Sequence, residues 1–563
     1  MHNSDRFIAA RDFLLQSRDD WETAHREFRW PQVDEFNWAI DYFDRIAEDN
    51  QAPALRVVND ANLDVTVSYA EMAKRSSQVA NFIQSRDVKP GDRILIALGN
   101  CVALWESMLA VIKLGTVMIP TATLLSGEEL QQRMQRGRVK CVITHAHLTD
   151  RFAGCAQDIV RIAIGEPTPG WINYAETTSA PESLTSRPPT RSDSPLFLYF
   201  TSGTTSQPKL VEHSHISYPV GHLSTLYWLG LKPGDTHLNL SSPGWAKHAW
   251  SCVFAPWNAQ SCVLAYQFDR FESRALLTML VRCAVSTFCA PPTVWRMLIQ
   301  HDLKSWPVRL REVISAGEPL NAEVIDRVRE AWSLTIRDGF GQTETTAAVA
   351  NSPGQPVKAG SMGRALPGYR IVLLDGDGQE SEEGEICVDL SNRPIGLMNG
   401  YSDDAEQTGV VMRDGFFHTG DVATRDADGY FTYVGRTDDV FKSSDYRISP
   451  FELESVLIEH AAVAEAAVVP SPDPVRLSIP KAFIVLAAGF SADAQTAQSI
   501  FQYVRNRVSP FKRIRCIEFS ELPKTLSGKI RRVELRRSEN QRRKGERARD
   551  NEYWEDQCAG ADQ

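Results

Sequence analysis

Thr201-Ser-Gly-Thr-Thr-Ser-Gln-Pro-Lys209 directly follows the apolar run Leu196-Phe-Leu-Tyr-Phe200. Apolar and aromatic residues that end abruptly in small hydroxylated residues and glycine predict a buried strand that opens into a tight polar loop. Backbone N–H groups and hydroxyls in such a loop bind anions, and Lys209 adds a mobile positive charge. The Walker A pattern needs a glycine-lysine pair that leads into a helix, whereas proline precedes the lysine here. The stretch 201–209, called the phosphate loop below, therefore predicts a phosphate-binding loop of another type.

The composition is that of a globular protein with more than one domain. A chain of 563 residues exceeds what one hydrophobic core usually serves. Hydrophobic residues make up 43% and charged residues 23% of the chain, which is ordinary for a globular protein. The net charge of −10 argues against a nucleic-acid-binding protein, which is normally basic.

The cysteines and the N-terminal residues indicate the cellular compartment in which the protein is expected. Ten cysteines are scattered singly without a CxxC pair, a spacing that gives neither a zinc site nor a disulfide framework and favours a reducing compartment. The first six residues lack the basic and then apolar plan of a secretory signal. No uncharged apolar run approaches the roughly 20 residues that cross a bilayer. We therefore expect a soluble, cytoplasmic protein without a transmembrane segment.

The first part of the chain alternates strand-like and helix-like segments. Residues 93–98 form an apolar run typical of a buried strand, a helical stretch follows over about 103–114, and another strand is expected over 117–120. This alternation predicts an α/β fold, with a large layered N-terminal domain and mainly parallel sheets.

A second, smaller unit is expected after Arg436. Ser449-Pro-Phe-Glu452 combines an N-cap serine, a proline at the first helical position and a glutamate three residues after the cap. Strands are expected over 462–469 and 481–486, and an amphipathic helix that ends at Ser509-Pro510. These elements predict a small α+β domain of about 100 residues, which is a usual domain size. Beyond it, a charge-dense tail with a solvated helix face is expected.

Further motifs follow in order along the chain: Ser315-Ala-Gly-Glu-Pro-Leu320, Asp338-Gly-Phe-Gly-Gln-Thr-Glu344, His418-Thr-Gly-Asp421 and Pro523-Lys-Thr-Leu-Ser-Gly-Lys529. Each alone is compatible with a turn that is closed by capping side chains. Together with the phosphate loop, in this order and spacing, they resemble the acyl-adenylate-forming (AMP-binding) superfamily. The resemblance spans about residues 35–535 and is closest to acyl-CoA synthetases of the acetyl and medium-chain branch, whose Gly-Trp pair matches Gly244-Trp245.

The resemblance implies a site for ATP, Mg²⁺ and coenzyme A. It implies that Lys209, Glu344 and Lys529 are catalytic, with Glu344 as the Mg²⁺ ligand. It implies nucleotide contacts at Thr201, Ser202, Gly203, Thr204, Thr205, Gly317, Glu318, Pro319, Asp338, Gly339, Phe340, Gly341, Gln342, Thr343, Asp421 and Arg436. It implies coenzyme A contacts at Ser444, Asp445 and Tyr446, and cofactor binding at Arg447.

The same resemblance implies a hinge at Asp438 and three segments: an N-terminal AMP-binding and acyl-binding domain over 1–436, a mobile C-terminal lid domain over 437–535 and the charged tail over 536–563. Two positions depart from the family. Phe340 stands where tyrosine is usual, which should alter a hydrogen bond near the nucleotide. Asp445 stands where glycine is usual, and its carboxylate would crowd or repel coenzyme A.

The chemistry implied is an ATP-dependent acid–thiol ligation that forms AMP. A carboxylate is a poor acylating agent, so it is first joined to AMP as a mixed anhydride and the acyl group then passes to a thiol. Trp245 and Gly341 are expected to line the acyl pocket, with Lys247, His248 and Trp250 as further candidates. Acetate-specific relatives have tryptophan where Gly341 stands, so a deeper pocket and a medium-chain or arylalkanoic acid are expected.

Two alternatives stay open from the sequence. A stand-alone adenylating ligase would load the acyl group onto the phosphopantetheine of a carrier protein, which would then be a partner, and Asp445 keeps this alternative open. A non-catalytic acyl or AMP sensor would be free to lose Lys209, Glu344, Asp421 and Lys529, all of which are present.

Overall fold

The structure is a computed structural model that describes residues 3–154, 158–201, 208–317, 320, 322–443, 446–473, 476–524, 530–542 and 551–559, without the side chains of Tyr446, Arg447 and Leu477. It divides into two compact units. The first comprises residues 1–371, 388–417 and 427–431, and the second comprises 372–387, 418–426 and 432–563. The boundary that we expect after residue 436 remains a prediction.

The first unit contains the sheet that carries the phosphate loop. In spatial order its strands are β19 (Gly400–Tyr401), β9 (Lys209–Ser214), β8 (Pro195–Thr201), β4 (Val117–Pro120), β3 (Arg93–Ala97), β5 (Val139–His145), β6 (Val160–Ile164) and β7 (Ile172–Asn173). The strands from β8 to β7 run parallel, whereas β9 and β19 are antiparallel to their neighbours. The strands expected over 93–98, 117–120 and 196–200 are confirmed.

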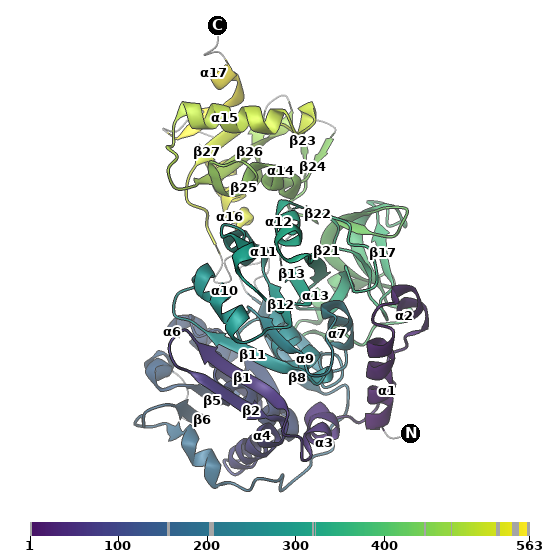
Figure 1. Cartoon of the computed structure of the whole chain (residues 1–563), viewed down its shortest axis with the longest axis vertical. Helices are drawn as coiled ribbons and strands as arrows, with labels where there is room; N and C mark the ends of the chain where they lie inside the picture. The colour runs from purple at the N-terminus through teal and green to yellow at the C-terminus, as the bar shows by residue number, and fades with distance from the viewer. Residues whose placement is uncertain are drawn as a thin grey trace. The chain divides into compact units, whose positions relative to one another are not determined.

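A second sheet of the same unit positions the other nucleotide motifs. Its strands, in spatial order, are β16 (Arg364–Ala365), β15 (Ala347–Ala350), β14 (Arg337–Gly341), β13 (Glu312–Ala316), β12 (Thr287–Ala290), β10 (Thr236–Asn239), β11 (Cys262–Gln267), β1 (Pro53–Asn59) and β2 (Asp64–Ser68). The strands from β14 to β1 are parallel. Figure 1 shows β1 beside β11, although about 200 residues separate them in the sequence.

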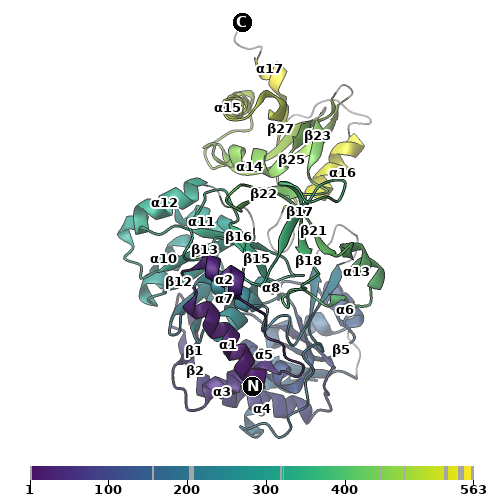
Figure 2. The same cartoon turned by 90° about the vertical axis from the view of Figure 1, so that its right-hand side faces the viewer.

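Helices accompany both sheets, as an α/β fold requires. In the first unit they are α1 (Asn3–Gln16), α2 (Trp21–Glu27), η1 (Trp38–Phe43), α3 (Asp44–Ala47), α4 (Tyr69–Gln84), α5 (Val102–Leu114), α6 (Gly127–Arg136), η2 (Ala146–Phe152), η3 (Tyr174–Ser179), α7 (Leu223–Leu229), α8 (Ala246–Ala249), η4 (Trp250–Phe254), α9 (Ala255–Asn258), α10 (Ser273–Arg282), α11 (Pro292–Leu298), η5 (Leu303–Ser305), α12 (Ala322–Trp332) and α13 (Ala405–Val411). Figure 2 shows α10, α11 and α12 grouped beside β12 and β13.

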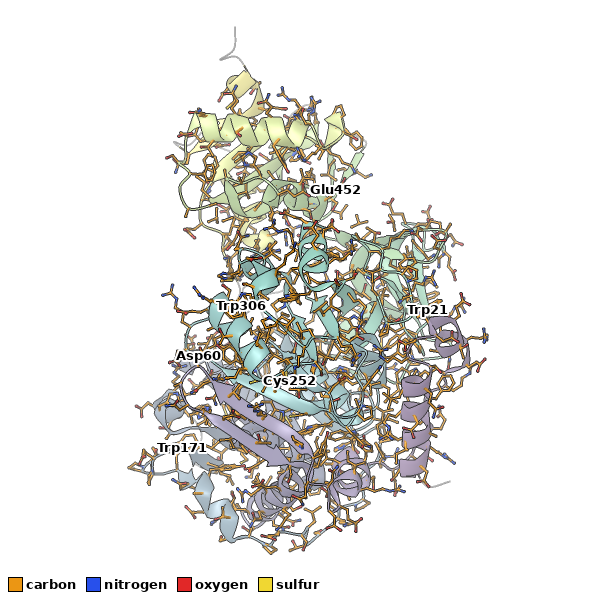
Figure 3. The ribbon with its side chains drawn as sticks, in the orientation of Figure 1. Trp21, Asp60, Trp171, Cys252, Trp306 and Glu452 are labelled. Atoms are coloured by element: carbon orange, nitrogen blue, oxygen red, sulfur yellow. The ribbon has the colours of Figure 1, made fainter. Side chains whose placement is uncertain are left out.

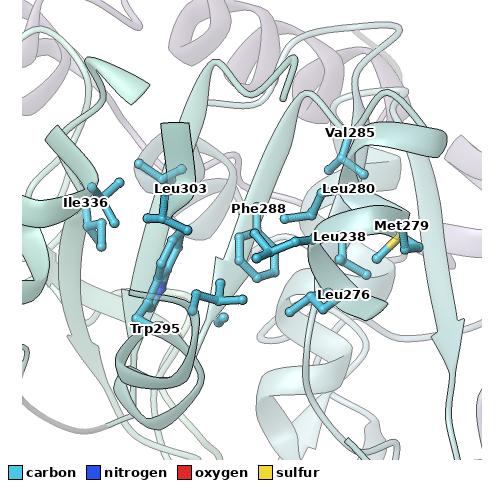
Figure 4. Packing of buried hydrophobic residues seen from close by; sticks show 14 of the residues in the cluster. Leu238, Leu276, Met279, Leu280, Val285, Phe288, Trp295, Leu303 and Ile336 are labelled. Atoms are coloured by element: carbon cyan, nitrogen blue, oxygen red, sulfur yellow. The ribbon is translucent and has the colours of Figure 1, made fainter. Parts of the chain in front are cut away.

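An apolar cluster joins these helices to the second sheet. Phe288 of β12 and Trp295 of α11 are fully buried, with ring centroids 5.0 Å apart. Leu276 and Leu280 of α10 pack into the same cluster, which Figure 4 shows from close by. Burial of this apolar surface fixes β12, β13 and β14 in place, and with them the ends of the strands that carry the motifs.

The second unit contains a mixed sheet in the order β25 (Val463–Asp473), β26 (Leu477–Leu486), β27 (Cys516–Phe519) and β28 (Glu552–Trp554). Its helices are α14 (Pro450–Ile458), α15 (Ala494–Arg505), η6 (Pro510–Lys512), α16 (Arg532–Arg542) and α17 (Glu555–Ala559), and β23 (Phe441–Ser443) pairs with β24 (Tyr446–Ile448). The expected cap is present, because the Ser449 side chain accepts a hydrogen bond from the backbone N–H of Glu452. The α/β fold with a small α+β unit is confirmed.

The described parts of 536–563 belong to this second unit. β28 extends its sheet, and Glu539 of α16 is buried, where its carboxylate accepts hydrogen bonds from Lys481 (2.8 Å) and Ser471 (2.6 Å). These buried contacts hold α16 against the sheet, so this part of the segment is not only a solvated helix face.

A further sheet runs in the order β17 (Ile371–Leu374), β18 (Glu383–Asp389), β21 (Phe416–Arg425) and β20 (Met412–Arg413), with β22 (Phe431–Arg436) paired with β21.

The cysteines that the structure describes are all free thiols. None of the described helices is both long enough and apolar enough to span a membrane.

Candidate active site

The phosphate loop connects two antiparallel strands. Thr201, the last residue of β8, pairs with Lys209, the first residue of β9. The loop is therefore closed by a strand pair and does not lead into a helix, which agrees with the departure from the Walker A pattern. Ser202, Gly203, Thr204 and Thr205 lie outside the described residues.

A tyrosine connects the two charged residues that we expect to act on the phosphates. The Lys209 Nζ atom lies 3.4 Å from the Tyr401 hydroxyl oxygen and 4.7 Å from the centre of its ring. The same hydroxyl donates a hydrogen bond of 3.0 Å to Oε1 of Glu344. Tyr401 lies on β19, next to β9, and it could not be expected from the sequence because no motif contains it. The Tyr401 hydroxyl therefore contacts both the ammonium group of Lys209 and the carboxylate of Glu344.

Two of the motifs that are expected to contact the nucleotide lie at the ends of two parallel strands. Gly317 follows β13, while Asp338, Gly339, Phe340 and Gly341 lie within β14. In open α/β sheets, ligands bind outside the carboxyl ends of parallel strands. Gly317 has φ +107°, which favours glycine, and a Cβ atom there would meet no atom within 4 Å. Glu318 and Pro319, which continue the motif, lie outside the described residues.

Asp338 is a buried carboxyl group beside a lysine. Burial raises its pKa to about 8, against the opposing effects of the Gly339 backbone N–H and of the positive charge of Lys247. The Lys247 Nζ atom donates a hydrogen bond of 2.9 Å to the backbone oxygen of Ala316, the last residue of β13. Lys247 thus ties α8 to the strand end that precedes Gly317.

Two tryptophans pack directly against the glycines of β14. A Cβ atom at Gly339 would lie 2.5 Å from the Trp228 ring, and one at Gly341 would lie 2.7 Å from Cη2 of Trp250 and 2.4 Å from the backbone oxygen of Thr346. Position 341 therefore borders an aromatic ring and not empty space. The depth of the acyl pocket that we expect at this point depends on Trp250 as well as on Gly341.

Backbone hydrogen bonds fix the rest of the motif that begins at Asp338. The carbonyl oxygen of Thr343 lies 2.7 Å from Nε2 of His213, a residue of β9. The backbone N–H of Gln342 donates to the Thr345 hydroxyl at 3.0 Å. These contacts fix the turn that carries Thr343 and Glu344 relative to the sheet of the phosphate loop.

The candidate acyl residues come from α8 and its surroundings. Trp250 is buried, and its indole N–H donates to the Tyr218 hydroxyl at 3.0 Å. Trp245 is half-buried at the start of α8, and His248 is fully buried with its ring centroid 5.5 Å from that of Trp105. Burial lowers the pKa of His248 to about 3, so the imidazole is neutral. The Trp105 indole donates to the carbonyl oxygen of Cys252 (2.7 Å), which is labelled in Figure 3.

Asp421 is the centre of the candidate ribose site in the second unit. It is buried in β21, where Oδ1 accepts a hydrogen bond of 3.0 Å from the Tyr433 hydroxyl and Oδ2 one of 3.1 Å from Arg436. Burial and the Asp421 carboxylate raise the pKa of Tyr433 well above its usual value. Burial lowers the pKa of Arg436, but the combined effects of Asp421, Tyr433 and Asp438 outweigh burial and the pKa is raised. Tyr433 was missed because it belongs to no motif.

The expected hinge follows β22. The Asp438 carboxylate lies 3.9 Å from Nε of Arg436 and 3.7 Å from Nη2 of Arg536. Tyr446 begins β24 and pairs with Ser443, and Arg447 follows it. Ser444, Asp445 and Lys529 lie outside the described residues, so their expected roles stay predictions.

Gly317 and the residues of β14 lie at the carboxyl ends of parallel strands, the position at which open α/β sheets bind ligands. The family model "AMP-binding enzyme" matches residues 43–402, and "AMP-binding enzyme C-terminal domain" matches 452–529. The chain belongs to the AMP-binding enzyme family.

Full-length relatives place the chain within that family. It is 42% identical to 4-hydroxybutyrate–CoA ligase 1 of Metallosphaera sedula, over 92% of this chain and 93% of that protein. It is 37% identical to the mitochondrial acyl-coenzyme A synthetase ACSM3 of Rattus norvegicus, over 94% of this chain and 95% of that protein. A crystal structure of the anthranilate CoA ligase AuaEII with anthranoyl-AMP superposes with a TM-score of 0.81 at 28% identity, covering 91% of this chain and 98% of that one. The chain is an AMP-forming acid–thiol ligase that uses ATP, Mg²⁺ and coenzyme A.

Proposed function

We propose that this ligase activates a medium-chain or arylalkanoic acid. In the first step a carboxylate oxygen attacks the α-phosphorus of ATP, the bond to pyrophosphate breaks and acyl-AMP forms. In the second step the sulfur of coenzyme A attacks the acyl carbon, AMP leaves with the bonding electron pair and the thiol proton is lost. The arrangement of Lys209, Tyr401 and Glu344 is the observation that supports the first step, and the surroundings of Gly341 are the observation that supports the class of acid.

The first step brings two anions together, so its transition state needs positive charge more than it needs a general base. Lys209 supplies one such charge, and the Tyr401 hydroxyl keeps the Glu344 carboxylate oriented. A carboxylate oxygen is a ligand type that Mg²⁺ accepts, commonly one or two of them together with substrate phosphates. Glu344 would therefore hold the ion, which supplies charge neutralisation at the phosphates.

Asp421 is proposed to bind the ribose. Its two oxygens accept hydrogen bonds from Tyr433 and Arg436, so the carboxylate is held in one orientation. A carboxylate in a fixed orientation accepts hydrogen bonds from two neighbouring hydroxyls with little loss of entropy. We propose that Lys529 is brought to the reacting carboxylate in the first step and withdrawn in the second, with Asp438 as the hinge.

The surroundings of Gly341 bear on the size of the acid. We propose that Trp250 closes one side of the acyl pocket and that Trp245 lines another. Because glycine stands at 341, the aromatic wall comes from Trp250 of η4 instead of from β14. We propose that this wall lies farther along the acyl chain than a side chain at 341 would, and that the pocket therefore admits acids longer than acetate. Each buried CH₂ group contributes roughly 0.8 kcal/mol, enough to favour longer acids several-fold per carbon.

The test is acyl-CoA production from ATP with octanoate, phenylacetate, 4-hydroxybutyrate and acetate, monitored for both acyl-AMP and thioester. We expect rapid thioester formation from octanoate or phenylacetate and slow formation from acetate. A preference for acetate would overturn the substrate proposal. 4-Hydroxybutyrate, the acid in the name of the M. sedula relative, would replace the proposed class if it were turned over faster than all the others.

The same assay distinguishes a coenzyme A ligase from a ligase that loads a carrier protein. Acyl-AMP that accumulates without thioester would favour loading of a carrier protein, and Asp445 at the expected coenzyme A contact would then be the residue to exchange for glycine. Absence of both products with every acid would favour a sensor.

We propose a cytoplasmic location, since the described cysteines are all free thiols. The mammalian relatives carry "mitochondrial" in their names, so fractionation of the native cells with a mitochondrial marker is the appropriate measurement.

A further inference from the structure

A glutamate, a cysteine and a histidine meet between two neighbouring strands of the second unit. Glu385 and Cys387 lie two residues apart on β18, so their side chains point to the same face of the sheet. His418 comes from β21, the next strand. Oε2 of Glu385 lies 2.8 Å from Nδ1 of His418, and the Cys387 sulfur lies 3.5 Å from the same nitrogen.

The three donor atoms have a separation that suits a single metal ion. All of them lie within 4.8 Å of one another. With bonds of about 2.3 Å to sulfur and about 2.0–2.2 Å to nitrogen and oxygen, a tetrahedral ion keeps its ligand atoms roughly 3.3–3.7 Å apart. The sulfur–nitrogen distance already fits, and the oxygen–nitrogen distance needs to open by about half an ångström.

The cluster is sheltered and its glutamate is already oriented. Cys387 is fully buried, and the side chains of His418 and Glu385 are 10% and 21% exposed. Oε1 of Glu385 accepts a hydrogen bond of 2.8 Å from the backbone N–H of Gly420. Glu385 therefore offers Oε2 alone, as a monodentate ligand on a fixed carboxylate.

The donor types select the ion. A thiolate and an imidazole favour borderline or soft cations such as Zn²⁺, whereas Mg²⁺ prefers oxygen ligands in octahedral geometry. Three protein ligands leave one tetrahedral position for water. We propose that Glu385, Cys387 and His418 bind one Zn²⁺ ion at a site that is separate from the Mg²⁺ site at Glu344.

Binding at this site has a defined proton balance. The Cys387 thiol must lose its proton to become a ligand, and the neutral imidazole of His418 must present Nδ1 without a proton. One proton is therefore released to solvent for each ion bound, provided that the thiol is protonated beforehand. The spacing of cysteines in the sequence does not reveal such a site, because only one of its ligands is a cysteine and His418 lies more than 30 positions after Cys387.

The test uses the full-length protein, freed of metal with a chelator and kept in excess Mg²⁺ to occupy Glu344. Titration with Co²⁺, followed by absorption, reports a thiolate ligand as a near-ultraviolet charge-transfer band. We expect a band that saturates at one equivalent of Co²⁺ and is abolished by one equivalent of Zn²⁺. Cys387→Ala should remove the band, and Cys141→Ala, which changes a buried thiol of β5 in the first unit, should retain it.

Glu385→Gln provides a second variant in case Cys387→Ala fails to fold. It keeps the size of the side chain and should weaken Zn²⁺ binding at least about 10-fold, as even changes beyond the direct ligands do. The absence of a charge-transfer band in the wild-type protein, or a band that persists in Cys387→Ala, would overturn the proposal. The cluster would then be a hydrogen-bonded group without metal.

Discussion

At the scale of single residues, Trp250 is the side chain that we expect to set acid length. Trp250→Leu should raise the ratio of kcat/KM for octanoate to that for butanoate by about 3-fold or more, because the smaller side chain leaves room to bury at least one further CH₂ group. The ratio is measured in one assay with both acids, so a reduced folded fraction does not affect it. Trp332→Leu, which removes a partly buried indole of the cluster shown in Figure 4, is the matched control and should leave the ratio unchanged.

The structure changes how position 341 should be tested. A tryptophan in place of Gly341 would need both Trp250 and the Thr346 backbone to move, since a Cβ atom alone already comes within 2.4 Å of the Thr346 oxygen. Trp250→Leu removes the clash with the indole, so that only the Thr346 backbone still has to move. We therefore expect Gly341→Trp to shift preference toward acetate or propionate in combination with Trp250→Leu, and Gly341→Trp alone to be poorly folded. If the double variant kept the wild-type acid profile, these two positions would not line the acyl pocket.

Among single residues, we expect Lys529 to contribute most clearly to the first step of catalysis. Lys529→Ala should lower acyl-AMP formation at least about 10²-fold, the scale for loss of a preorganised electrostatic group. Thioester formation from preformed acyl-AMP should change far less, since the lysine acts on the first step. The two half-reactions are measured separately, by pyrophosphate release and by thioester formation from synthetic acyl-AMP. Equal losses in both would contradict the assigned role.

At the scale of elements, a buried ion-pair network fixes the starts of β13 and β14. Glu312 lies at the first position of β13 and binds Arg337 of β14 (2.6 Å) and Arg311 (2.6 Å), and it also binds Arg18. The side chains of Glu312 and Arg337 are only 11% and 6% exposed. These strands end in two of the motifs that are expected to contact the nucleotide, so the network positions these motifs from the opposite end of the sheet.

Glu312→Gln should lower the free energy of unfolding by about 3–5 kcal/mol, because it leaves the buried charge of Arg337 without its partner. Asp326→Asn breaks an exposed pair with Arg329 on α12 (side chains 57% and 47% exposed) and should cost at most about 1 kcal/mol. Urea unfolding of both variants followed by tryptophan fluorescence makes the comparison. Similar losses in the two would show that burial does not govern the Glu312 network.

The elements also show what could be predicted from the sequence. The strands around residues 93–120 and the helix after Ser449 follow from local signals, namely apolar runs and a capping serine. Tyr401 and Tyr433 could not be found in this way, because each reaches its carboxylate through strand pairing or packing and has no motif of its own. The same holds for Trp250, which approaches Gly341 from an element about 90 positions earlier.

At the scale of the whole molecule, the first unit buries several neutral histidines. Burial lowers the pKa of His213, His215, His237 and His248 to about 3 and that of His222 well below its usual value. In the unfolded chain a histidine takes up a proton near pH 6.5. The unfolded state thus binds more protons below that pH, and the histidine contribution to stability, complete above pH 6.5, is lost as the pH falls toward 3.

His215 allows this effect to be isolated. It is fully buried, and neither ring nitrogen has a hydrogen-bond partner among the described residues, so leucine can replace it without breaking a side-chain hydrogen bond. Relative to wild type, the free energy of unfolding of His215→Leu should rise by about 1.4 kcal/mol for each pH unit below about 6. Urea titrations at pH 7.5, 6.0, 5.5 and 5.0 measure this difference, and the value at pH 7.5 is the internal reference for the change in packing. A difference that stays constant over this range would mean that His215 does not enter the fold as a neutral imidazole.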